Sequence, residues 1–164
     1  MELEKIRKDI LSGKSIEEIL EKFNWKEFEE IISEIFIDND FIVRKNFRFK
    51  TNKRFEIDII ATKGNLILCV DCKEWSKGRY KKTGLKYSAE NQERRIREFK
   101  KFLKKNLIAK NLLKIDLKLK FYSLIVTLLE EDLIVEGKTF FVPAWKLNSF
   151  LVELEQYLSF SKSI

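Results

Sequence analysis

The sequence of 164 residues contains no histidine, one proline, five glycines and two cysteines. The absence of histidine excludes zinc sites with histidine ligands and the Ser-His or Cys-His pairs of nucleophilic catalysis. So little glycine and proline leaves little room for long loops. No apolar run reaches the roughly 18–20 residues that span a bilayer, and the N-terminal MELEKIRKDI lacks a signal peptide's apolar stretch. We therefore expect a cytoplasmic protein that makes no membrane contact.

The two cysteines have the C-x-x-C spacing of a redox pair or of half a zinc site, in the segment LILCVDCKEW (66–75). This segment is rich in β-formers, and residues three apart on a strand point to opposite faces of the sheet. The chain has no further cysteine or histidine to complete a metal site. We interpret Cys69 and Cys72 as small buried apolar residues, reduced in the cytosol.

What the sequence does contain indicates a globular protein with a localised basic surface. Hydrophobic residues make up 45% of the chain and the net charge is +7. Residues 73–105 hold 13 basic and 4 acidic side chains, so the whole excess of positive charge lies in one fifth of the chain. Such a surface favours a nucleic-acid partner, and a solvated lysine-rich face is the alternative.

The hydrophobic pattern predicts helices near 2–11, 16–23 and 25–37, and strands at 41–49, 54–61 and 66–72. A basic loop, 74–87, then leads to a helix from about 88 to 106, a buried strand at 120–129 and a last helix at about 145–158. The fold class is therefore α/β, with an α-β-β-β-α-β core whose central sheet is flanked by helices. We divide the chain into an N-terminal helical extension (1–23) and a main domain (24–164).

Polar side chains interrupt the apolar elements at four points. Strand alternation places Asp71 and Lys73 on one face of the third strand, near its end. On the strand before it, Phe55, Ile57 and Ile59 are expected to share a face, with Asp58 on the opposite one. The helix at 25–37 turns one glutamate, Glu29, toward the sheet. Gln92 interrupts the apolar stripe of the helix at 88–106.

A carboxylate pair beside a lysine suits hydrolysis of a phosphodiester with the help of Mg²⁺. This ion binds one or two carboxylates, keeps several waters and takes phosphate oxygens as further ligands. The alternative is that Asp58, Asp71 and Lys73 form ion pairs at the ends of two strands.

In this order and spacing, Glu29, Asp58 and Asp71-Cys72-Lys73 resemble the PD-(D/E)xK nuclease superfamily, which has the restriction-endonuclease-like fold. Within that superfamily, the sequence is most similar to archaeal Holliday-junction resolvases and Mrr-type restriction enzymes. The stretch FEEIISEIFIDNDFIV (28–43) resembles the Mrr-like opening, with Asp40 in place of a glycine. Ile57 replaces the proline of the motif. The resemblance covers residues 25–129.

The resemblance implies a role for each of these residues. Asp58, Asp71 and the backbone carbonyl of Cys72 would bind the metal, Lys73 would position the attacking water, and Glu29 and Gln92 would complete the site. We expect Mg²⁺ as the cofactor, with Mn²⁺ as a substitute. Basic residues of the loop and the following helix would contact nucleic acid: Lys77, Arg79, Lys81, Lys82, Lys86, Arg94 and Arg95.

The sequence thus predicts a metal-dependent DNA endonuclease that acts on duplex, branched or flap DNA. RNA is the less favoured substrate, and a homodimer is expected. A protein of the same fold that binds nucleic acid without cutting it is the alternative function.

Overall fold

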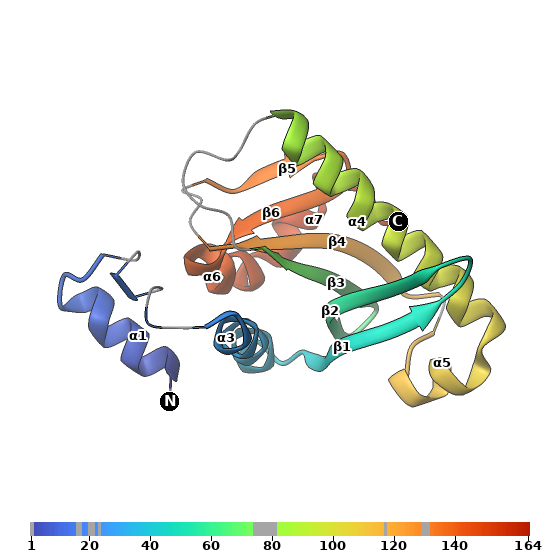
Figure 1. The fold of residues 1–164 in the computed structure, drawn as a ribbon, viewed down its shortest axis with the longest axis horizontal. Helices are drawn as coiled ribbons and strands as arrows, with labels where there is room; N and C mark the ends of the chain where they lie inside the picture. Colours follow the sequence, from blue (N-terminus) through green and yellow to red (C-terminus); the bar gives the residue numbers. More distant parts are fainter. Residues whose placement is uncertain are drawn as a thin grey trace.

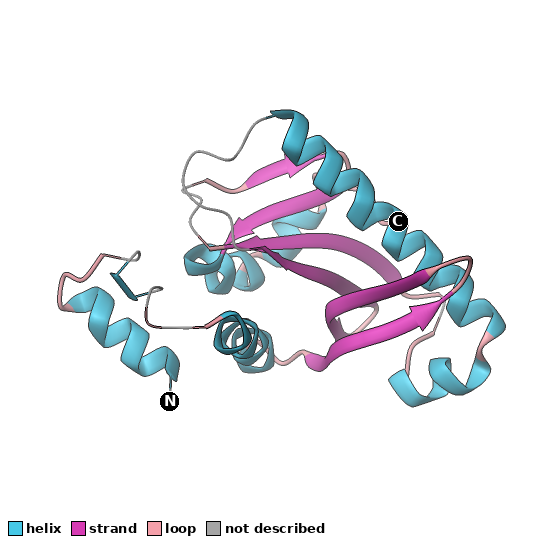
Figure 2. Cartoon of the chain, viewed as in Figure 1, coloured by secondary structure: helices cyan, strands magenta, loops and turns pink. Residues whose placement is uncertain are grey.

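A six-stranded mixed sheet forms the centre of the molecule, and helices cover both of its faces (Figures 1 and 2). The structure is a computed structural model, and it describes residues 2–15, 18–19, 22, 24–73, 82–116, 118–128 and 132–164. The strand order is β1-β2-β3-β4-β6-β5. Within the described residues, no helix combines the length and the apolar character needed to cross a membrane.

The first three strands of the chain form an antiparallel meander. The two strands that follow β3 in the order of the sheet run parallel to it. The meander consists of β1 (Ile42–Lys50), β2 (Arg54–Lys63) and β3 (Leu66–Lys73). Next come β4 (Lys120–Thr127), parallel to β3, then β6 (Thr139–Pro143), parallel to β4, and finally β5 (Ile134–Glu136), antiparallel to β6. Helix α3 (Trp25–Asp38) precedes β1, and α4 (Lys82–Lys105) connects β3 to β4. The predicted α-β-β-β-α-β order and the mixed sheet flanked by helices are confirmed.

Each face of the sheet has its own hydrophobic core. Apolar side chains recur on α3 and α4 at intervals of three or four, so each helix turns one stripe toward the sheet. On one face α3 packs together with α6 (Leu147–Val152) and α7 (Leu154–Leu158), and its stripe includes Phe28, Ile32 and Phe36. On the other face α4 packs with α5 (Leu107–Leu113), and its stripe includes Ile96, Phe99 and Leu103.

The start of α3 is fixed by a capping box formed by Asn24 and Glu27. The side chain of Asn24 accepts a hydrogen bond from the backbone N–H of Glu27 at 3.0 Å, and Glu27 accepts one from the backbone N–H of Asn24 at 2.9 Å. Two N–H groups that a helix start leaves without partners are thereby satisfied. The cap fixes where the helix begins, and hence which glutamate it turns toward the sheet.

The prediction that Phe55, Ile57 and Ile59 share one face of β2 is wrong. Phe55 and Ile57 pack into the core on the α4 side, whereas Ile59 packs into the core on the α3 side. The change occurs at Asp58, which lies between the paired positions Ile57–Phe47 and Ile59–Lys45, so Asn46 is its counterpart on β1. Asn46 has φ 52°, a left-handed conformation that asparagine tolerates better than most residues and that turns the strand pair locally.

The helices differ from the predictions at three points. Helix α4 begins at Lys82 rather than near residue 88, so Lys86 belongs to a helix and not to a loop. The short α5, capped by Asn106, was not predicted. The last helix is divided into η1 (Ala144–Lys146), α6 and α7, with a break at Glu153.

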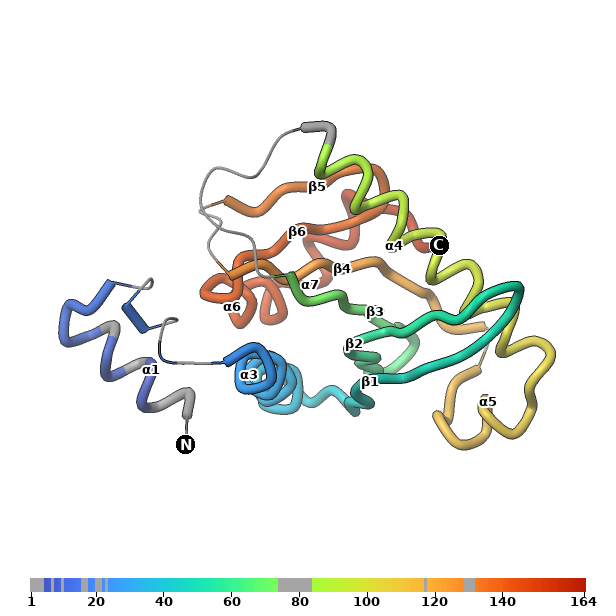
Figure 3. The backbone as a smooth tube through the Cα atoms, in the orientation of Figure 1, coloured from blue at the N-terminus to red at the C-terminus, as the bar shows by residue number. Residues whose placement is uncertain are grey.

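At the N-terminus, α1 (Glu2–Leu11) agrees with the first predicted helix and lies beyond α3, away from the sheet (Figure 3). The second predicted helix, 16–23, lies largely outside the described residues.

Asp40, which stands where the resembling motif has glycine, has φ 66°. Short polar residues such as aspartate enter this left-handed region at low cost, so the departure from the motif keeps the turn before β1.

Replacing Phe99 with alanine should lower the free energy of unfolding by about 3–5 kcal/mol, because this fully buried ring fills the core between α4 and the sheet. Replacing Phe160, which is 81% exposed, with alanine should change the free energy of unfolding by less than about 0.5 kcal/mol. Urea unfolding followed by circular dichroism measures both. Equal effects of the two substitutions would show that the packing is wrong.

Candidate active site

A cavity of about 430 Å³ lies where β2, the end of β3 and α4 meet. Four of the residues predicted to form the catalytic site line it: Asp58, Asp71, Lys73 and Gln92. They come from three separate elements, so it is the sheet and the crossing of α4 that bring them together. The rest of the wall is largely polar or basic.

Asp71 lies near the end of β3 and is 8% exposed. A carboxylate in this position is costly to bury unless it is paired. The ammonium of Lys73, two residues along the same face, lies 2.9 Å from Asp71 Oδ2. The guanidinium of Arg95, from α4, lies 3.2 Å from Asp71 Oδ1. Each carboxylate oxygen thus has its own cation.

Asp58 takes part in the hydrogen bonding of the sheet through its side chain. The regular pairing of β2 with β3 ends at Ile59 and Val70. One residue further on, Asp58 Oδ2 accepts a hydrogen bond from the backbone N–H of Cys72 at 2.9 Å. Burial and the negative charges of Asp71 and Glu29 raise the pKa of Asp58 from 3.8 to about 7, against the lowering effect of that bond.

The two cysteine thiols are buried and unreactive. Burial raises the pKa of the Cys69 thiol to about 12. Burial and the charges of Asp58, Asp71 and Glu29 raise the pKa of the Cys72 thiol well above its usual range. A thiol that stays protonated is a poor nucleophile and a poor metal ligand, which agrees with the interpretation of both residues as apolar packing.

Glu29 projects from α3 toward the same end of the sheet but does not line the cavity. Burial and the charges of Glu56 and Asp71 raise its pKa, while a hydrogen bond with Trp25 lowers it. Its charge in turn contributes to the raised pKa of Asp58. Its negative charge therefore acts on Asp58 without lining the cavity.

Gln92 is 1% exposed and joins α4 to β3. Its Nε2 donates to the backbone carbonyl of Cys69 at 3.1 Å, and its Oε1 accepts from Arg95 at 2.6 Å. Both polar atoms of this side chain thus have a partner within the apolar stripe, and Gln92 contacts the arginine that pairs with Asp71.

The residues predicted to contact nucleic acid separate into three groups. Arg94 and Arg95 line the cavity, whereas Lys86 is exposed on α4 outside it. The side chain of Lys82 and the whole of Lys77, Arg79 and Lys81 lie outside the described residues.

Several residues of the cavity were missed by sequence reasoning. Lys53, Arg54 and Tyr87 line it. The segment KTNKR (50–54) lies between the strands predicted at 41–49 and 54–61, and its three cations in five residues were a signal of a phosphate-binding edge.

Within the described residues, no group of three or more cysteine, aspartate or glutamate side chains is arranged around a point that could hold a metal ion. Two carboxylates do converge, however, and their proximity is the reason that the pKa of Asp58 is raised by Asp71. Mg²⁺ needs only one or two protein carboxylates and completes its shell with water and phosphate oxygens. The residues present therefore fit this ion.

The sequence model of the nuclease-related domain (NERD) matches residues 22–128, about two thirds of the chain. The chain belongs to the NERD family. The match includes Asp58, Asp71, Lys73 and Gln92.

Two similar proteins have no stated function. An uncharacterized protein of Archaeoglobus fulgidus is 31% identical over 136 residues, which cover 82% of this NERD chain and 95% of that protein. A crystal structure of a protein of unknown function is 17% identical, and the match covers 74% of this chain and about half (51%) of that one. Its TM-score of 0.40 is too low to carry an argument.

The raised pKa of Asp58 predicts an unusual dependence of stability on pH. Between pH 3.8 and about 7 the folded state keeps a proton that the unfolded state has released, so the free energy of unfolding should fall as the pH rises through this window. Asp58→Asn keeps an acceptor for the Cys72 N–H but cannot ionise. At about pH 8 it should be more stable than the natural protein, by roughly 2–4 kcal/mol.

Urea unfolding in EDTA at several pH values measures this difference. The control is Asp40→Asn, the same chemical change at a side chain that is 91% exposed. If Asp58→Asn and Asp40→Asn have the same pH profile, Asp58 is not the titrating group.

Proposed function

We propose that this NERD protein is a metal-dependent DNA endonuclease with a site of the PD-(D/E)xK type. The observation that supports this best is the meeting of Asp58, Asp71 and Lys73 in one cavity whose remaining wall is mostly polar and basic. Purely structural strand-end ion pairs would not require a cavity of this size beside them.

In this proposal Asp58 and Asp71 hold Mg²⁺, together with the backbone carbonyl of Cys72. When bound, the ion supplies an activated water and neutralises charge on the phosphate. Ionised carboxylates are required for this, and a nearby cation would also return the pKa of Asp58 toward its usual range.

The amino group of Lys73 can serve the reaction from its present place. It lies 2.9 Å from Asp71 Oδ2, so it stands beside the proposed ligand and can orient the attacking water or donate a hydrogen bond to a phosphate oxygen. Arg95, which now contacts Asp71 and Gln92, is long enough to turn toward the same phosphate.

Besides Lys73, four cations on the wall of the cavity suit a polyanionic substrate: Lys53, Arg54, Arg94 and Arg95. Contacts of this kind bind the phosphate backbone without reading its sequence. DNA is proposed as the substrate, and a homodimer as the working form.

A second function is supported by a specific observation. Lys73 and Arg95 already neutralise Asp71 without a metal ion. The site could therefore be a stable arrangement of ion pairs in a protein that binds nucleic acid and does not cleave it.

The test is cleavage of duplex, branched and flap DNA in Mg²⁺, in Mn²⁺ and in EDTA. We expect cleavage only with a divalent ion. Asp71→Asn should lower the rate at least about 100-fold, since the loss of an outer-shell partner alone commonly costs roughly 10- to 100-fold. The control Asp40→Asn makes the same change outside the cavity and should cleave normally. Binding of DNA without cleavage in any of these ions would contradict the enzyme and favour the second function.

A further inference from the structure

A second groove, of about 730 Å³, lies on the β1–β2 hairpin beside the active-site cavity. Three of its lining residues also line that cavity: Arg54, Phe55 and Glu56. The two hollows therefore adjoin each other on the hairpin. A strand whose phosphate lies in the cavity would have its neighbouring nucleotides over this groove.

The groove contains aromatic rings that are held in place from below. Phe55 is partly exposed and stacks on the buried Phe49, with ring centroids 5.3 Å apart and planes inclined by 17°. Phe102 of α4, also partly exposed, lies 5.4 Å from Phe49. The ammonium of Lys53 lies 5.2 Å from the centre of the Phe55 ring. A flat base could take the place of this lysine, which would then be free to bind a phosphate.

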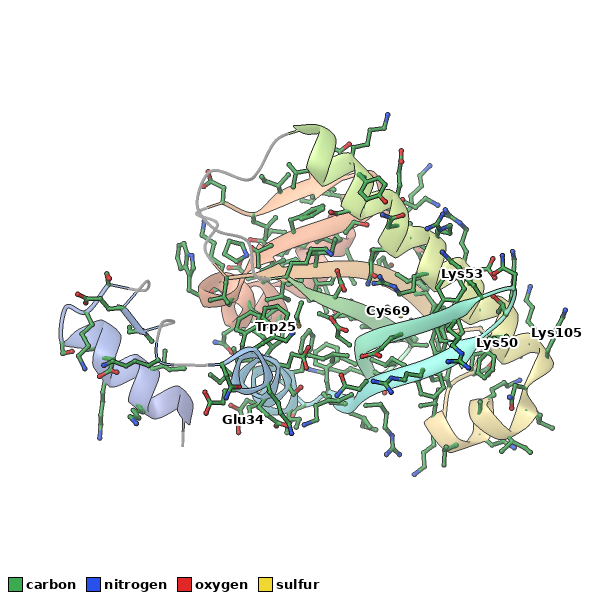
Figure 4. All side chains as sticks on the ribbon, viewed as in Figure 1. Trp25, Glu34, Lys50, Lys53, Cys69 and Lys105 are labelled. Carbon is green, nitrogen blue, oxygen red and sulfur yellow. The ribbon has the colours of Figure 1, made fainter. Side chains whose placement is uncertain are left out.

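The charges around the rings suit a phosphate backbone. The one acid of the groove, Glu56, is neutralised by Arg48 at 2.7 Å. Lys50 and Arg54 make no ion pair with any other described residue. Beyond Lys50 and Phe102 a third hollow, of about 510 Å³, continues toward Lys105. Figure 4 shows Lys50, Lys53 and Lys105 at the same end of the molecule.

The hairpin turn beside the groove is tied to α4 by polar and aromatic contacts. The hydroxyl of Thr51 donates to Glu98 Oε2 at 2.6 Å, and Glu98 is paired with Lys101 at 2.7 Å. Phe49 and Phe102 pack across the same junction. A preformed groove loses less entropy on binding than a flexible one.

We propose that this groove is a binding site for unpaired nucleotides of the DNA strand next to the scissile phosphate, so that the substrate is DNA with a single-stranded arm. Bases in a duplex are already stacked on each other, and only unpaired bases offer their faces to a ring. Cations alone would bind paired and unpaired DNA alike. The aromatic rings therefore carry the preference. This inference rests on the proposed nuclease site for its position but not for its test.

Binding is measured in EDTA, where no cleavage is needed, by fluorescence anisotropy with a flap DNA and with a fully paired duplex of equal length. The natural protein should prefer the flap. The double variant Phe55→Leu with Phe102→Leu keeps apolar volume and removes both rings, so it should weaken flap binding about tenfold or more and duplex binding less than about twofold. The double variant Lys50→Glu with Arg54→Glu should weaken the binding of the flap and of the duplex alike. The control Lys118→Glu with Lys162→Glu makes the same change of charge outside the three hollows and should have a much smaller effect.

A folded Leu variant that keeps the full preference for the flap would overturn the proposal, as would a natural protein that binds duplex and flap equally. If the Leu variant does not fold, the comparison of flap and duplex binding by the natural protein still tests the proposal. A 2-aminopurine in the arm should change its fluorescence on binding, because it leaves its neighbouring bases for the rings, and unchanged fluorescence would refute stacking. A preference for the flap without any cleavage would refute the proposed nuclease function and support the proposed binding of unpaired nucleotides in the groove. Cleavage without a preference for the flap would support the nuclease function and refute the proposal for the groove.

Discussion

Two aspartates on neighbouring apolar strands are the constraint on which the rest of the site depends. Asp58 and Asp71 lie at the point where β2 and β3 part, with the hydrophobic core on both sides. Buried charge of one sign must be compensated. The chain compensates it with a backbone N–H for Asp58 and with Lys73 and Arg95 for Asp71. The compensation is incomplete, because the pKa of Asp58 remains at about 7. A divalent cation bound by both carboxylates would complete it.

The same constraint explains why α4 crosses the sheet as it does. Its apolar stripe packs on the sheet, and Gln92 in that stripe is hydrogen-bonded to Cys69 of β3 and to Arg95, which pairs with Asp71. Its other end is tied to the β1–β2 hairpin through Glu98 and Thr51. One helix thus positions the site and the groove beside it, so a polyanion that enters the cavity meets basic walls from the hairpin and from α4.

Much of this could be predicted from the sequence, and the exceptions have physical reasons. The order of the elements and the inward positions of Asp71, Lys73 and Gln92 follow from local periodicity, which the structure keeps. The switch of faces along β2 could not be predicted, because it depends on the left-handed Asn46 of the partner strand. The hairpin cations were missed because their role depends on where the hairpin lies relative to α4, a distant contact that no short motif records.

The central claim is that Asp58 and Asp71 together form a site for a divalent metal ion. Diffraction from crystals grown with Mn²⁺ tests it most directly, because the anomalous signal locates the ion without assumptions about activity. We expect one ion in contact with both carboxylates, with Arg95 displaced from Asp71, and no ion in crystals of Asp71→Asn. Diffraction that shows no ion between the two aspartates, with Lys73 and Arg95 still paired with Asp71, would contradict the claim.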